Sequence, residues 1–168
     1  MSHPVVNISA LKLNSFGPKD GSERFGASIG EIGEVIGSKG LGAMYVRVEQ
    51  GKRAFPFHNH LAADEMFIIL EGSGIYRFGD QEIPVKAGDV CAAPKGGPDT
   101  AHQLINSGDS TLAYIGISTM PDPDIVEYPD SGKFSVTGIA PGLDFWSAHF
   151  RHIGRKSESY EYWDGEEG

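Results

Sequence analysis

The sequence predicts an all-β fold, a sandwich or barrel built from many short strands. Its 23 glycines and 10 prolines lie dispersed between short apolar runs, a distribution typical of turns rather than of a low-complexity chain. Residues 41–50 alternate between two faces, as a half-buried strand does. One face carries Met44, Val46 and Val48, and the other carries Tyr45, Arg47 and Glu49. This alternation supports strands rather than helices as the building blocks.

The rest of the chain fits the same expectation. Seven further segments have the length of strands: 54–60, 65–70, 74–78, 82–85, 89–93, 101–105 and 111–119. Turn sequences such as FGDQ, KAGD and NSGDS separate them. Residues 24–36 are glycine-rich, so a strand is favoured over a helix, and we expect no helix in the first 120 residues. Residues 120–133 contain three prolines and are expected to form a surface loop, with another strand at 134–137.

Size and charge restrict the classes of function. With 168 residues the chain fits one domain that can bury a real core. A net charge of -9 argues against a nucleic-acid partner and against binding to an anionic membrane surface. The single cysteine, Cys91, allows no intrachain disulfide, and the first residues show no signal-peptide pattern. We therefore expect a cytoplasmic protein.

Two stretches, residues 51–72 and 88–106, carry the side chains most suited to binding a metal ion. His58 and His60 are two residues apart, so both point to the same face of a strand, and Glu65 follows shortly after. A third imidazole, His102, comes from the later stretch. Imidazole and carboxylate together suit zinc, iron, nickel, copper or manganese. The alternative is that the pair of histidines precedes a turn at the surface and Glu65 is a solvated carboxylate.

The two stretches resemble the paired motifs of the cupin superfamily. The first motif is represented by Gly51, His58, His60, Glu65 and Gly72, and the second by Gly88, Pro94, Gly96, His102 and Asn106. Three more residues than usual separate Gly96 from His102. The resemblance implies a double-stranded β-helix, a jelly-roll barrel spanning about residues 41–119, with N-terminal strands in 1–40 and a C-terminal extension in 120–168. It also implies one divalent transition metal (Zn, Mn, Fe or Ni) held by His58, His60, Glu65 and His102.

Within that superfamily, DEMFIILEGSG and the later MPDPDIVEYPDSGK are similar to a single-domain group named sugar phosphate isomerase-like. The resemblance implies a metal-dependent enzyme that moves a proton on a small polar metabolite, such as a sugar or sugar phosphate. Because one scaffold supports many chemistries, two alternatives remain open. One is an iron- or copper-dependent dioxygenase, and the other is a non-catalytic module that binds a small molecule. No catalytic residue is assigned.

Three further residues are candidates for binding a substrate. Tyr45 and Arg47 can face the barrel interior, where Arg47 would pair with a carboxylate or phosphate. The alternative is an exposed arginine on an edge strand, because the register is unknown. Asp99 lies in the longer loop before His102, where it can orient a ligand or simply form a turn.

The C-terminal extension is unusually aromatic, with Phe145, Trp146, Phe150, Tyr160, Tyr162 and Trp163. A disordered tail does not normally carry so many aromatic side chains. We expect residues 144–163 to pack on the domain or on a second subunit, and the protein to form a homodimer.

Overall fold

The computed structural model describes residues 3–139 and 148–166. Its strands are β1 (Asn14–Phe16), β2 (Ala27–Glu31), β3 (Leu41–Val48), β4 (Asn59–His60), β5 (Glu65–Glu71), β6 (Ser73–Phe78), β7 (Gln81–Lys86), β8 (Val90–Ala93), β9 (His102–Ile105), β10 (Leu112–Thr119), β11 (Asp124–Tyr128), β12 (Lys133–Gly138) and β13 (Phe150–Arg155). Short helical turns are η1 (Ile8–Ala10), α1 (Ile32–Ile36), η2 (Pro98–Thr100) and η3 (Lys156–Glu158). The prediction of an all-β chain is confirmed.

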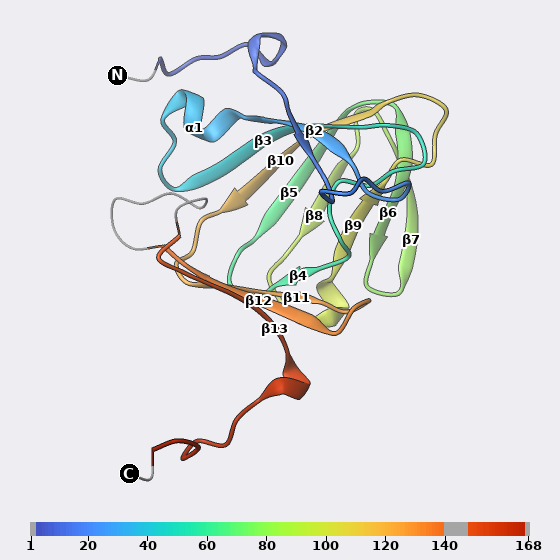
Figure 1. Cartoon of the computed structure of the whole chain (residues 1–168). Helices are drawn as coiled ribbons and strands as arrows, with labels where there is room; N and C mark the ends of the chain where they lie inside the picture. The colour runs from blue at the N-terminus through green and yellow to red at the C-terminus, as the bar shows by residue number, and fades with distance from the viewer. Residues whose placement is uncertain (1–2, 140–147, 167–168) are drawn as a thin grey trace.

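The strands form three sheets (Figure 1). The largest has the order β1-β2-β3-β10-β5-β8, and the second has the order β7-β6-β9. Neighbours within each are antiparallel, and the two sheets enclose the core of the barrel, as a double-stranded β-helix does. Each sheet contributes fully or nearly buried side chains to this core, among them Val46, Ile69, Tyr114, Tyr76 and Leu104.

The alternation predicted for residues 41–50 sets the two faces of β3. Val46 and Val48 lie in the core, and Met44 packs against it from the same face. Opposite Met44 lies Gly116 of β10, and the Phe67 ring packs against this position. A second glycine, Gly72, turns the chain between β5 and β6 with a φ of 76°. A Cβ there would lie 2.3 Å from the carbonyl oxygen of Thr111, so this motif position requires glycine.

The third sheet, β13-β12-β11-β4, lies across the lower end of the barrel in Figure 1. It corrects the expectation that residues 120–133 form a loop, because residues 124–128 are strand β11. Pro121, Pro123 and Pro129 flank this strand and do not interrupt its hydrogen bonds. The strand predicted at 134–137 lies within β12. The C-terminal extension therefore pairs with β4, which carries His60.

Two other expectations also need correction. Residues 24–36 are only partly strand, because the short helix α1 follows β2 directly. Its glycines serve the local geometry: Gly33 lies close to Ala43 of β3, and Gly37 ends the helix in the left-handed conformation, with a φ of 75°. Of the strand predicted over 54–60, only Asn59 and His60 belong to a strand.

The aromatic tail packs on the domain only in part: Phe150–Arg155 forms β13, which pairs with β12, whereas the aromatic side chains beyond it are exposed. Tyr160, Tyr162 and Trp163 are 83%, 82% and 68% exposed. The segment beyond β13 extends away from the barrel in Figure 1. Phe145 and Trp146 lie outside the described residues. Over residues 3–139 and 148–166, no helix has the length and apolar character needed to cross a membrane.

Candidate metal centre

Three segments bring the predicted metal ligands together at the end of the barrel covered by the third sheet. His60 lies on β4, and Glu65 begins β5. His58 is held beside His102 of β9 by a pair of backbone hydrogen bonds, with N–O distances of 3.2 and 2.8 Å. The sequence alternation places His58 and His60 on one side, as predicted, and the backbone pairing adds His102 to them.

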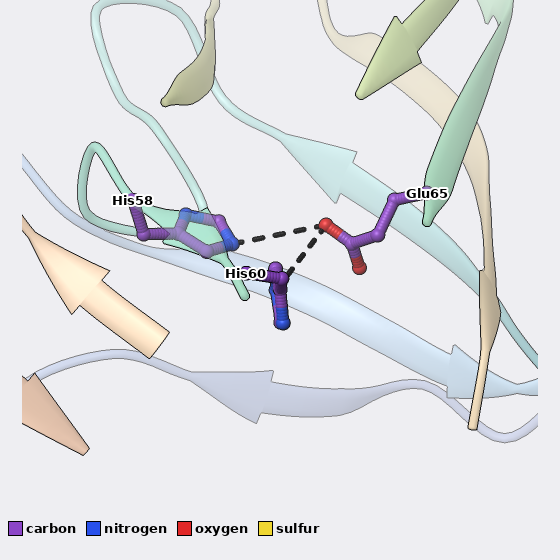
Figure 2. Close-up of side chains that lie close together, drawn as sticks. All are labelled: His58, His60 and Glu65. Atoms are coloured by element: carbon purple, nitrogen blue, oxygen red, sulfur yellow. Dashed lines mark ion pairs between the residues drawn. The ribbon is translucent and has the colours of Figure 1, made fainter. Parts of the chain in front are cut away.

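The side chains converge on one carboxylate oxygen, Oε2 of Glu65 (Figure 2). It lies 3.8 Å from Nε2 of His58 and 3.5 Å from Nε2 of His60. Nitrogen and oxygen ligands bind such ions at about 2.0–2.2 Å, so two ligands of one ion lie roughly 3–3.5 Å apart. One ligand atom from each of His58, His60 and Glu65 lies within 4.8 Å of the others. This group can hold a metal ion.

The second ring nitrogen, Nδ1, of both His58 and His60 has a hydrogen-bond partner. Nδ1 of His58 lies 2.8 Å from the carbonyl oxygen of Pro56, and Nδ1 of His60 lies 2.5 Å from Oδ2 of Asp124. An Nδ1–H that donates to such an acceptor fixes the ring orientation and leaves the Nε2 lone pair for a metal. The donor set and its hydrogen-bond partners therefore fit a bound transition metal.

The protonation states of His58 and Glu65 favour the same interpretation. Burial, helped by the nearby charge of His102, lowers the pKa of His58 to about 3, so this ring is neutral at physiological pH. Burial alone would also lower the pKa of His60, but the hydrogen bond to Asp124 and the charge of Glu65 outweigh it and raise that pKa. Burial would raise the pKa of Glu65, but the hydrogen bond to His102 and the neighbouring rings lower it. Glu65 is therefore an anion, as a metal ligand must be.

His102 lies beside the same carboxylate, with 2.9 Å between its Nε2 and Oε2 of Glu65. Its ring centroid lies 4.5 Å from that of His58, and the residue is only 2% exposed. The three extra residues before it are accommodated by η2, and they do not turn the ring away from the barrel interior. Asn106 fixes the end of the same strand by donating to the carbonyl oxygens of Val48 and Ser110.

The three predicted substrate-binding residues lie elsewhere. Tyr45 and Arg47 occupy the face of β3 opposite the core residues, where Arg47 donates to the Tyr45 hydroxyl and to Glu71. Asp99 is exposed within η2. The structure does not bring these three to the histidines. A role in substrate binding for any of them stays a prediction that this placement does not support.

Residues that the motif did not indicate complete the site. Asp124 lies on β11, two positions before Val126, the pairing partner of His60, so it points to the same face. Besides His60 it accepts a hydrogen bond from the backbone N–H of Ala62. Tyr128, on that face too, places its ring 6.3 Å from His58. The signal in the sequence was weak, since Asp124 lies in a proline-rich segment 64 residues from its partner.

Comparison with known proteins identifies the scaffold. Residues 44–118 match the family described as the cupin domain. The chain contains a cupin domain. Among curated proteins, it is 32% identical over 60 residues to an oxalate-binding protein of Thermotoga maritima, a match that covers 36% of this chain and 47% of that protein. It is also 32% identical over 74 residues to an uncharacterized protein of Methanocaldococcus jannaschii, covering 42% and 57% of the two chains. The chain thus spans about half the length of the curated relatives it matches.

Solved structures extend the likeness beyond the cupin domain. A sugar phosphate isomerase of the cupin superfamily from Silicibacter pomeroyi has a TM-score of 0.76 at 23% identity, and the match covers 96% of this chain and 98% of that one. A protein from Acidithiobacillus ferrooxidans with the provisional name sugar phosphate isomerase has a TM-score of 0.75 at 21% identity, covering 92% and 91%. These likenesses show that the fold is shared, including the strands outside residues 44–118.

Proposed function

We propose that this cupin protein is a metal-dependent enzyme that moves a proton on a small polar metabolite, such as a sugar or a sugar phosphate. The observation that carries the proposal is the convergence of imidazole Nε2 atoms on Oε2 of Glu65, with the Nδ1 atoms of His58 and His60 engaged behind them. His102 is proposed as the fourth ligand, with its Nε2 2.9 Å from the same oxygen.

A metal ion bound by these residues would act as a Lewis acid toward a carbonyl or hydroxyl oxygen of the substrate. The protein side chains supply the rest. Asp124 holds the His60 ring in one orientation. The aromatic rings of Phe67, Tyr76 and Tyr114 belong to the barrel core next to His102 and exclude water from that side of the site. Because water is excluded there, the effective dielectric constant is low and charge interactions within the site are stronger.

The names of the two similar solved structures support a sugar or sugar phosphate as the substrate class. A second candidate function, a module that binds a small dicarboxylate without converting it, is favoured by the curated relative named oxalate-binding protein. The same ligand cluster would serve it, since an ion with open coordination positions can take carboxylate oxygens.

The two functions are separated by proton exchange. Protein loaded anaerobically with zinc or manganese would be incubated with sugars, sugar phosphates and oxalate in heavy water, and the carbon-bound protons would be followed by nuclear magnetic resonance. The enzyme proposal predicts metal-dependent loss of one proton signal from a sugar or sugar phosphate. Tight binding of a ligand that is recovered without exchange would contradict it and favour the binding module. Turnover that needs oxygen and iron or copper would instead identify a dioxygenase.

We also propose that the protein acts as a cytoplasmic homodimer. The exposed aromatic side chains of Tyr160, Tyr162 and Trp163 support a second copy as the surface on which the tail packs. Light scattering coupled to size-exclusion chromatography should give twice the mass of the chain, and removal of residues 156–168 should shift the equilibrium toward monomer. A monomeric full-length chain would contradict the proposal.

A further inference from the structure

Strand β9 separates two groups of polar side chains. His102 and Leu104 point into the barrel, so Gln103 and Ile105 point outward. Directly paired residues of neighbouring strands share a face. Arg77 of β6 pairs with Gln103, and Arg53 pairs with Ile105. Both arginines therefore lie on the outer face of the sheet that carries His102 on its inner face.

A third arginine joins them through Phe25. Phe25 pairs with Arg53, and its ring has the guanidinium carbons of Arg24 and Arg53 at 5.6 and 6.0 Å from the centroid. The backbone N–H of Arg53 also donates to the carbonyl oxygen of Arg24. We refer to Arg24, Arg53 and Arg77 as the arginine cluster.

The cluster has fewer anionic partners than cations. Arg77 makes a two-point ion pair with Asp130, at 2.8 and 2.9 Å, and lies 3.5 Å above the Phe57 ring. Over the described ranges 3–139 and 148–166, the guanidinium groups of Arg24 and Arg53 make no hydrogen bond or ion pair. Nε of Arg53 is buried without a hydrogen-bond partner. Such an atom costs free energy unless a ligand or water satisfies it.

The positive charges of the cluster repel one another. Burial and the positive charges of Arg24 and Arg77 lower the pKa of Arg53, and Asp130 offsets only part of this. Three guanidinium groups around one carboxylate are unusual in a chain whose net charge is -9. An additional anion would relieve this repulsion.

We propose that the arginine cluster binds a small oxyanion at a site separate from the histidines, on the opposite face of β9. The planar guanidinium fork matches the oxygen atoms of both phosphate and carboxylate groups. The ligand class is therefore a phosphate-bearing or carboxylate-bearing small molecule. This inference does not depend on the proposed reaction, because it uses none of the residues of the metal centre.

The test is isothermal titration calorimetry on the full chain at constant ionic strength, with inorganic phosphate in one arm and malonate in the other. Variants Arg24→Gln and Arg53→Gln each remove one cation of the cluster. Asp130→Asn removes the competing carboxylate and leaves every arginine in place. Lys39→Gln is the matched control, since it removes one exposed positive charge in the turn between α1 and β3, outside the pairings that define the cluster.

The proposal predicts saturable binding of at least one anion, and the tighter of the two identifies the phosphate or the carboxylate source. Affinity should fall about tenfold in Arg53→Gln and several-fold in Arg24→Gln, and should be unchanged in Lys39→Gln. Asp130→Asn should bind more tightly than the wild type. Since Arg24 is exposed, its variant keeps the test valid if Arg53→Gln does not fold.

Three results would overturn the proposal. The first is the absence of saturable binding for both anions. The second is equal affinity in the wild type and in Arg24→Gln and Asp130→Asn. The third is loss of binding after treatment with a metal chelator, which would place the anion on the metal and not on the arginines.

Discussion

The two faces of β9 illustrate two ways in which one sheet holds charged groups. On the inner face, the polar side chains have partners. Nε2 of His102 lies within hydrogen-bonding distance of the Glu65 carboxylate. Asn106, at the end of the strand, donates to two backbone carbonyl oxygens. On the outer face, Arg53 keeps a buried Nε without a partner, and the Gln103 carbonyl oxygen, Oε1, has none either. The inner face is a preorganised ligand set, whereas the outer face leaves one buried donor and one buried acceptor unpaired.

The faces also differ in packing, and this gives the largest expected effect. Leu104 is 6% exposed in the barrel core, whereas its neighbour Ile105 is only partly buried on the outer face. Leu104→Ala should lower the free energy of unfolding by about 2–5 kcal/mol, because it leaves a cavity. Ile105→Ala, the matched control, should cost about 1 kcal/mol. Urea unfolding followed by fluorescence measures both, and equal losses would contradict the assignment of the two faces.

Much of the inner face could be predicted from the sequence. The metal ligands belong to short sequence patterns: two histidines at alternate positions, an acid shortly after, and a third histidine between glycine and asparagine. The strands that carry these residues can also be recognised from short stretches of sequence. The loop before His102 is three residues longer than in the motif. It closes as the single turn η2, because the added residues include Pro98 and Asp99, which suit a 3-10 turn.

The parts that could not be predicted depend on contacts between distant segments. The prolines around β11 indicated a loop, yet they flank a strand that pairs with β4 and brings Asp124 to His60. Alternation in β3 separated Tyr45 and Arg47 from Val46 correctly, but it could not tell which face lies inside. The arginine cluster combines residues from three separate segments, and no local motif marks it.

The second prediction concerns the hydrogen bond behind His60. Asp124→Asn keeps the shape of the side chain and removes the charge that orients the imidazole. The metal affinity should fall about 10–100-fold, because such outer partners fix both the tautomer and the ring orientation of a ligand. Competition with a chromogenic chelator measures this. Asp122→Asn is the control, since Asp122 contacts the backbone of Ile139 and not a ligand. Equal affinities in the wild type and Asp124→Asn would contradict the role of Asp124.

The smallest effect is expected on the outer face and depends on pH. The hydrogen bond from Arg77 lowers the pKa of Asp130 below its usual value. A lowered pKa contributes stability above the unfolded value, about 3.9, and this contribution is lost as the pH falls through the folded value. Asp130→Asn should therefore be less stable than the wild type at pH 7, by less than about 1 kcal/mol, since the pair is partly exposed.

That difference should shrink in acid, because Asp130 of the wild type becomes neutral as well. Urea unfolding of both proteins from pH 7 down to pH 3 measures it. A difference that stays constant over this range would show that the ion pair with Arg77 does not contribute as described.

The most direct test of the inner face as a metal centre is elemental analysis of protein purified without chelators. The wild type should contain about one transition-metal ion per chain, and the metal found separates proton-transfer chemistry from oxygen chemistry. His58→Ala and His102→Ala should each lose most of it, whereas His149→Ala, an exposed histidine outside the site, should retain it. Full occupancy in both His58→Ala and His102→Ala, or a wild type that takes up no transition metal, would contradict the central claim.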